Sequence, residues 1–290
     1  MPWYIYSLLA VFIGSFGVIA AKWALNLGIN KIKFLTIVFV GIFACYFLYT
    51  FQDLSNLITS SKFITYLEWG FLAGALSFLG NLAEIKSYEE SPNPGYIKAI
   101  TSVNAILILL AAALLFGSPV GLTKLIGSII IIAGLLPLLD YRSGKKNGLW
   151  QVMALLAMLC YGALILVAKQ MGNLGFSAQE ILLILFFFAC LGFVILYFFK
   201  GRTNNFSTSS KVYIPILIYI VISFAFNLLV FIAVNLAPNA GYSSSIGNAS
   251  VILVLILSII FFPRDKGGEF NLYKWMGAFL IVLGVILTVF

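Results

Sequence analysis

The sequence predicts an all-α membrane protein with ten transmembrane helices, arranged as two five-helix inverted-topology repeats. Three observations lead to this fold class. The chain repeats itself at half its length, its composition is that of a membrane protein, and each half contains an odd number of long apolar stretches.

The first observation is the internal repeat. Pro92-Asn93-Pro94-Gly95-Tyr96 recurs as Pro238-Asn239-Ala240-Gly241-Tyr242, at an offset of 146 residues from Asn93 to Asn239 in a chain of 290. Other matches at offsets of 146 to 150 residues are Ser77-Phe78 with Ser223-Phe224, Asn81-Leu82 with Asn227-Leu228, Ala21-Lys22 with Ala168-Lys169, and Lys124, Gly127 and Gly134 with Lys274, Gly277 and Gly284. A fixed offset indicates a duplicated structural unit. We therefore expect repeats at 1–147 and 148–290, integrated into one membrane domain.

The second observation is the composition, with 62% apolar and 9% charged residues. A soluble domain has about 25% charged residues. About 20 apolar residues form a helix that crosses the hydrocarbon core. The ten candidate stretches, in order, are 4–25, 33–51, 63–87, 94–116, 121–139, 149–171, 178–199, 211–236, 239–262 and 271–290. They do not alternate apolar and polar residues as barrel strands do, so they are expected to be helices.

The connections support this division into helices. Polar stretches 52–62 and 200–211 separate the second helix of each half from the third. The Pro-Asn motifs at 92–96 and 238–242 separate the third helix from the fourth. The remaining connections are short, and no soluble domain interrupts them.

The third observation is that five is an odd number of crossings. The second half must therefore enter the membrane from the side opposite to the first, which is the inverted-repeat architecture of many secondary transporters, with a site near the midplane. The alternative is a duplicated scaffold without a transport pathway.

Several function classes are not supported by the residues. The chain has no histidine, no phosphate-binding loop and no cysteine spacing typical of a metal or disulfide site, so we expect no cofactor, no metal and no enzymatic activity. The first span aligns with a later span, so a cleaved signal is not expected. The net charge of +8 is interpreted as a basic face that meets anionic lipid head groups, without a nucleic-acid partner.

The basic residues gather at one set of loops. Thirteen lie at loops after odd-numbered helices, namely Lys22, Lys31, Lys33, Lys86, Arg142, Lys145, Lys146, Lys200, Arg202, Lys211, Arg264, Lys266 and Lys274. Three lie near loops after even-numbered helices, namely Lys62, Lys124 and Lys169. The positive-inside rule then places both termini outside the cytoplasm.

The ten-helix repeat resembles the EamA branch of the drug/metabolite transporter superfamily. The local matches are Phe16-Gly17-Val18-Ile19-Ala20-Ala21-Lys22 and the Lys-x-x-Gly-x-x-x-x-x-x-Gly pattern that begins at Lys124 and at Lys274. The resemblance implies a proton-coupled or facilitative carrier of small metabolites. It also implies cytoplasmic termini, opposite to the charge distribution. The Gly-Glu that members often carry before the last helix of each half is replaced by Gly117-Ser118 and Pro263-Arg264.

Polar residues inside the predicted spans are the candidate site, because they are costly in lipid and usually face an interior or a water-filled cavity. Ser77, Asn81 and Glu84 form one stripe on a helix, at spacings i, i+4 and i+7. The proposed substrate-binding or coupling residues are Asn81, Glu84, Tyr96, Lys98, Thr101, Asn104, Asn227, Ser244 and Asn248.

These candidates have alternative interpretations. Glu84 either binds a proton or a cationic group, or belongs to a solvated rim near Lys86. Lys98 is a counter-ion of Glu84 or an anchor for a substrate carboxylate, and we expect it to approach Glu84 or to share a polar cavity with it. The serines and Asn248 could instead bond neighbouring helices, and Tyr96 could be an interfacial anchor.

Paired glycines predict close helix contacts, within the monomer or between monomers. They are Gly70 with Gly74, Gly127 with Gly134, and Gly277 with Gly284.

The predicted function is secondary transport, without ATP, of a small polar metabolite such as an amino acid. We expect alternating access, export, possible coupling to protons, a monomer or homodimer, and the bacterial inner membrane. A flippase for a lipid-linked substrate and a non-transporting scaffold are the alternatives. A polar groove open to lipid would favour the flippase, and an enclosed polar stripe favours the carrier.

The charge distribution predicts the result of a labelling experiment. A membrane-impermeant thiol reagent applied from outside should label a cysteine placed in 52–62 and spare one placed in 142–147, because the basic loop lies in the cytoplasm. The reverse labelling pattern would contradict this orientation.

Overall fold

The structure is a computed structural model, which describes residues 1–90, 97, 100–101, 103–138, 149–201, 210–262 and 272–289. All regular secondary structure in these ranges is helical. The α-helices are α1 (Trp3–Asn26), α2 (Lys31–Thr50), α3 (Leu54–Ile58), α4 (Phe63–Glu90), α6 (Asn104–Phe116), α7 (Leu122–Leu135), α8 (Leu149–Asn173), α9 (Ala178–Leu196), α10 (Tyr213–Leu236), α11 (Ala240–Gly247), α12 (Ser250–Phe261) and α13 (Leu272–Val289). Single turns of other helix types are η1 (Phe51–Asp53), η2 (Leu136–Leu138), η3 (Tyr197–Gly201) and η4 (Ser210–Val212).

The helices have the length and surface of membrane spans. Among the described residues, seven helical spans are long and apolar enough to cross a membrane. Three further apolar helices, at Asn104–Phe116, Leu122–Gly134 and Trp275–Thr288, are shorter. Large apolar side chains cover the outside, with Leu114 86% and Phe199 81% exposed. Such a surface is unfavourable in water and suits a hydrocarbon solvent, so the predicted all-α integral membrane class is confirmed.

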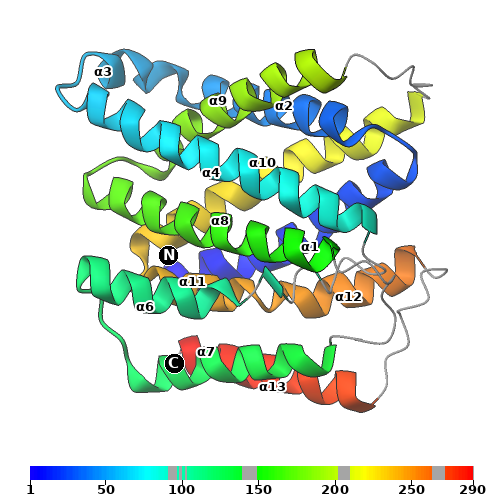
Figure 1. Cartoon of the computed structure of the whole chain (residues 1–290). Coiled ribbons are helices and arrows are strands. Elements are labelled where there is room, and N and C mark those ends of the chain that lie inside the picture. Colours follow the sequence, from blue (N-terminus) through cyan, green and yellow to red (C-terminus); the bar gives the residue numbers. More distant parts are fainter. Residues whose placement is uncertain are drawn as a thin grey trace.

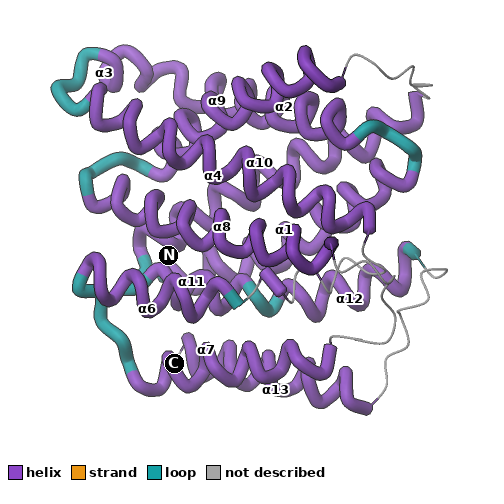
Figure 2. The backbone as a smooth tube through the Cα atoms, viewed as in Figure 1, coloured by secondary structure: helices purple, strands orange, loops and turns teal. Residues whose placement is uncertain are grey.

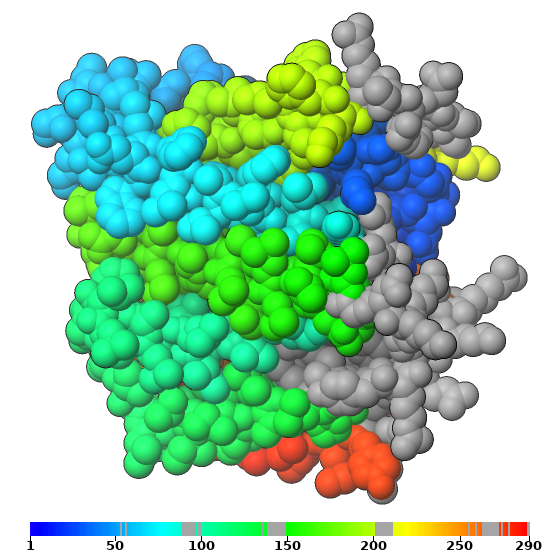
Figure 3. Space-filling view, in the orientation of Figure 1, coloured from blue at the N-terminus to red at the C-terminus, as the bar shows by residue number. Residues whose placement is uncertain are grey.

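The helices lie side by side along one common direction, and the connections alternate between the two ends of the molecule (Figures 1 and 2). The N- and C-termini lie at the same end in Figure 1. The main helix contacts pair α1 with α10, α4 with α8 and α9, α2 with α9, α6 with α11, and α7 with α13. On the face drawn in Figure 3, the side chains of α4 meet those of α8.

Glycines bring α7 and α13 into close contact within one chain. A Cβ added at Gly127 would lie 2.7 Å from the carbonyl oxygen of Gly284, and one added at Gly284 would lie 2.6 Å from the oxygen of Gly127. Gly134 stands in the same relation to Gly277, at 2.7 Å. Because these distances are shorter than van der Waals contact, only glycine fits, and the glycine face predicted from the sequence is used inside the monomer.

The connections between α1 and α2 and between α8 and α9 have the same structure. Gly28 and Gly175 have φ angles of +82° and +95°, which close the last turns of α1 and α8. Two residues later, the side chains of Asn30 and Ser177 accept main-chain hydrogen bonds and begin α2 and α9. Both pairs are separated by 147 residues in the sequence.

The predicted span 239–262 consists of two helices instead of one. The Asn239 side chain accepts a hydrogen bond from the Gly241 amide and starts α11. Turn-type hydrogen bonds around Asn248 and Ala249 then separate α11 from α12. Helices often break where small and polar residues compete with the main-chain ladder.

Gly127→Ala should lower the thermal unfolding temperature, because its Cβ would force the backbones of α7 and α13 apart. The expected cost is about 1–3 kcal/mol, as for other overpacked contacts. Gly247→Ala is the matched control, since nothing lies within 4 Å of its Cβ position. Equal unfolding temperatures for the two variants would show that the α7–α13 contact is not close in the protein.

Candidate functional site

A cavity of about 270 Å³ lies among α1, α2, α4, α6, α8, α9, α10, α11 and α12. Seven of the nine predicted site residues line it, namely Asn81, Glu84, Thr101, Asn104, Asn227, Ser244 and Asn248. The other two, Tyr96 and Lys98, lie outside the described residues, and so does the predicted approach of Lys98 to Glu84. Polar residues that are far apart in the sequence are thus gathered around one cavity.

Glu84 is a buried carboxylate with tyrosine partners. Its side chain is 8% exposed. Its Oε1 accepts a hydrogen bond from the Tyr88 hydroxyl at 2.8 Å, and its Oε2 accepts one from the Tyr161 hydroxyl at 2.6 Å. Tyr219 of α10 lies close enough to interact with its charge. Glu84 is therefore buried and does not belong to a solvated rim.

Helix packing explains how Tyr161 reaches the carboxylate. A Cβ on Gly80 of α4 would lie 2.9 Å from the Tyr161 ring, so the glycine leaves the space that this ring occupies. Sequence reasoning missed both tyrosines. Tyr88 could have been found because it follows Glu84 by four residues, which is one helical turn. Tyr161 gave no such signal, because its contact depends on the packing of α8 against α4.

Asn81 and Asn227 have the same geometry in α4 and α10. Each Nδ2 donates to the main-chain oxygen four residues earlier, Ser77 at 2.8 Å and Ser223 at 2.7 Å. Asn81 Nδ2 also lies 3.4 Å from Ser77 Oγ. Both side chains line the cavity. The two amides, 146 residues apart in the sequence, therefore make the same contact within their helices and line the same cavity.

The serines of α11 have divided roles. Ser243 Oγ lies 3.0 Å from Ser7 Oγ of α1, and Ser245 Oγ lies 2.8 Å from Ser128 Oγ of α7. These pairs bond neighbouring helices, as the alternative interpretation of the serines expected. Ser244 donates to the Ala240 carbonyl at 3.2 Å, within its own helix, and lines the cavity.

Aromatic and aliphatic side chains complete the cavity wall. Phe39, Phe186 and Phe231 are buried and line it. Phe226 also lines it and lies against Gly14, where an added Cβ would be 2.6 Å from the ring. The cavity therefore combines a polar side with an apolar side, as small-molecule sites commonly do.

Lys169 ties α8 to the end of α10 near this site, and its side chain is only 9% exposed. Its Nζ donates to the main-chain oxygens of Val234 at 3.3 Å, Asn235 at 3.2 Å and Ala237 at 2.9 Å. Val234 and Asn235 belong to the last turn of α10 and Ala237 is the residue that follows it, where intrahelical donors run out. Lys22 of α1 donates to the main-chain oxygen of Tyr88 at 3.5 Å. Tyr88 is equivalent to Val234 in the sequence repeat.

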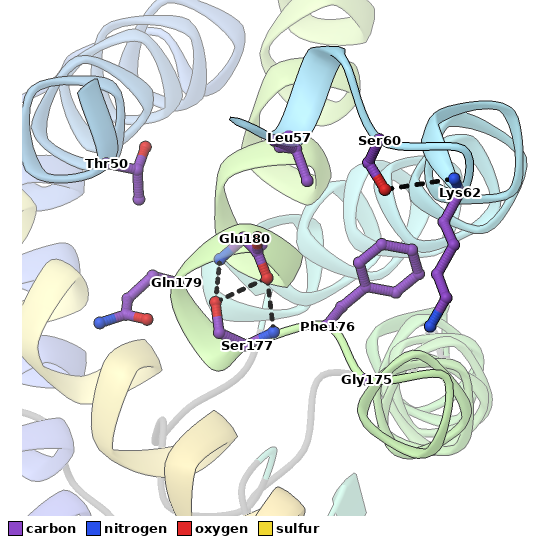
Figure 4. Close-up of a pocket in the computed structure, with 9 residues that line it drawn as sticks. All are labelled: Thr50, Leu57, Ser60, Lys62, Gly175, Phe176, Ser177, Gln179 and Glu180. Atoms are coloured by element: carbon purple, nitrogen blue, oxygen red, sulfur yellow. Dashed lines mark hydrogen bonds between the residues drawn. The ribbon is translucent and has the colours of Figure 1, made fainter. Parts of the chain in front are cut away.

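A second pocket, of about 400 Å³, lies at one end of the molecule between the α2–α4 connection and the α8–α9 turn (Figure 4). Its polar groups bond one another: Ser177 and Glu180 form a helix cap, and Lys62 donates to the Leu174 carbonyl at 2.8 Å. None of the predicted site residues lines this pocket. The cavity that the predicted residues line is therefore the candidate site.

Comparison with known proteins agrees with this fold. Residues 148–290 match the EamA-like transporter family, so the chain belongs to that family and to the drug/metabolite transporter superfamily. A crystal structure of another protein superposes with a TM-score of 0.72 at 13% identity, and covers 99% of this chain and 96% of that chain. At this identity the likeness shows the fold alone. No curated protein matches the sequence.

Lys169→Met should lower the thermal unfolding temperature, because three buried carbonyl oxygens would lose their donor while the apolar stem is kept. We expect a cost of about 1–3 kcal/mol. Lys62→Met is the matched control, since it removes one exposed hydrogen bond to a carbonyl. If both variants melt alike, Lys169 does not fix the end of α10.

Proposed function

We propose that the protein is a secondary carrier that moves a small polar metabolite, such as an amino acid, across the membrane by alternating access, without ATP hydrolysis. The single observation that carries this proposal is the cavity among the helices, which collects intramembrane polar residues from both halves of the chain. Membership of a transporter family supports it. We propose export as the direction and the bacterial inner membrane as the location, and we expect no catalytic activity.

We further propose ten spans in two inverted repeats, 1–147 and 148–290. Equivalent contacts support this arrangement. The Tyr46 ring lies 4.6 Å from that of Phe224, and the equivalent rings of Phe193 and Phe78 lie 4.7 Å apart. The helix contacts follow the repeat in the same way, because the contact between α1 and α10 is equivalent to the contact between α8 and α4. The family match also begins where the second repeat is expected to begin.

The cavity lies where two such halves would move against each other. Glu84 belongs to the first half, whereas Tyr161 and Tyr219 belong to the second. Rocking of the halves would therefore change the hydrogen bonds of this carboxylate, and with them its affinity for a proton. This is how Glu84 would couple proton movement to the movement of a solute.

The alternatives require features that differ from these. A flippase for a lipid-linked substrate requires a polar groove open to lipid, whereas the polar side chains described above line one cavity among the helices. A homodimer through the glycine faces of α7 and α13 would need surfaces that already contact each other within the chain, which favours the monomer.

Transport itself can be tested in proteoliposomes. A thermal-shift screen of small metabolites selects solutes that stabilise the purified protein, because a ligand that binds the folded state raises its stability. The selected solutes should then exchange across the membrane in a counterflow assay. Solutes that bind without any exchange would contradict the carrier and favour a scaffold.

Glu84→Gln should make this exchange independent of pH while the protein stays folded, because glutamine cannot take up or release a proton. Glu68→Gln is the matched control, at an exposed position of the same helix outside the cavity. Transport rates are measured across a range of pH on both sides of the membrane. An unchanged pH profile in Glu84→Gln would remove Glu84 from the coupling mechanism.

A further inference from the structure

We propose that the transported solute presents a protonated primary amine, which is bound by the amide oxygens of Asn81 and Asn227 together with the Glu84 carboxylate. This inference rests on the proposed carrier function and names the chemical class of its substrate. The amine could belong to a simple amine or to an amino acid, since both carry the same ammonium group.

The orientation of the two amides is fixed by their partners. Each asparagine contacts a main-chain carbonyl oxygen of its own helix, at 2.8 Å for Asn81 and 2.7 Å for Asn227. A carbonyl oxygen only accepts hydrogen bonds, so the amide atom that faces it must be the nitrogen. The amide oxygen is then the branch left to the cavity that both residues line.

The amide oxygens are acceptors that the protein leaves for another molecule. Within the described residues, neither oxygen accepts a hydrogen bond, whereas both nitrogens are occupied. A hydrogen-bond acceptor away from bulk water favours a donor strongly. Two amide oxygens from opposite halves of the chain therefore select a solute that carries several N–H donors.

Glu84 adds charge to this preference. It is the carboxylate among the described residues that line the cavity, and it lies on the stripe of α4 that holds Asn81, three residues further along. Residues three apart lie on the same face of a helix. A negative charge in the cavity that both amides line favours a cation with N–H groups, and an ammonium supplies three such donors in a small volume.

The remaining wall would hold the body of the solute. Phe186 and Phe231 are buried apolar walls, and Phe226 adds another aromatic surface. A cavity of about 270 Å³ accommodates a small molecule with an apolar part. A short alkyl chain with an amine at one end is therefore a suitable probe.

Four probes that share one skeleton separate the contributions. Butylamine has the ammonium, N,N,N-trimethylbutylammonium keeps the charge without N–H donors, and 1-butanol lacks the charge. Norvaline adds a carboxylate to the butylamine skeleton. Each is added to the purified full-length protein, and the change in unfolding temperature is measured, so the test does not depend on transport.

Butylamine or norvaline should raise the unfolding temperature, whereas the trimethylated cation and the alcohol should not. Stabilisation by norvaline alone would identify an amino acid as the source of the ammonium, and stabilisation by butylamine a simple amine. Equal stabilisation by the trimethylated cation or by butanol would overturn the proposal. So would the absence of any effect from both amine probes. A different class of stabilising solute in the wider screen would leave the carrier function standing.

Variants test the two amide oxygens directly. Asn81→Leu and Asn227→Leu each keep the side-chain size and remove the acceptor, and each should weaken binding of the stabilising amine about tenfold or more, as expected for a hydrogen bond to a charged group. Asn26→Leu, at an exposed position at the end of α1, is the matched control and should bind normally. Unchanged affinity in both cavity variants would overturn the proposal. Two independent positions keep the test valid if one variant does not fold.

Discussion

The absence of hydrogen-bond partners in lipid is the constraint on which this structure depends. Every polar group in a span must find its partner within the protein or face an enclosed space. Serines bond across helices, Lys169 caps the end of α10, and the carboxylate of Glu84 accepts two tyrosine hydroxyls. Seven of the polar residues predicted as site residues line one cavity. The lipid around the protein therefore favours a site among the helices, where polar groups do not face hydrocarbon.

Close helix crossings bring these groups together, and glycine makes the crossings possible. Where α1 crosses α10, Gly14 lies against the Phe226 ring, and where α8 crosses α4, Gly80 lies against the Tyr161 ring. The residues of these pairs are equivalent in the repeat, but glycine and aromatic residue have exchanged helices. The same backbone contact therefore places an apolar ring on one side of the cavity and a hydroxyl-bearing ring on the other.

In the two-repeat arrangement that we propose, this exchange makes the site asymmetric. The asparagines at 81 and 227 are the same in both halves, whereas Glu84 corresponds to Val230 and Tyr88 to Val234. Equivalent backbone positions supply the framework, and unequal side chains supply the charge. In the carrier that we propose, the equivalent halves present similar openings to each side, and the one charged group recognises the solute.

The sequence by itself determined the helical membrane class, because about 20 consecutive apolar residues can satisfy their backbone only as a helix in lipid. It also indicated seven cavity residues, since a polar residue within a span has few other places to lie. Tyr161, the break between α11 and α12, and the ties made by Lys169 were decided by the tertiary structure. Each depends on which helices contact each other and at which position along their length. Contacts between distant segments are set by side-chain shape across the whole bundle, and the periodic pattern of one segment does not predict them.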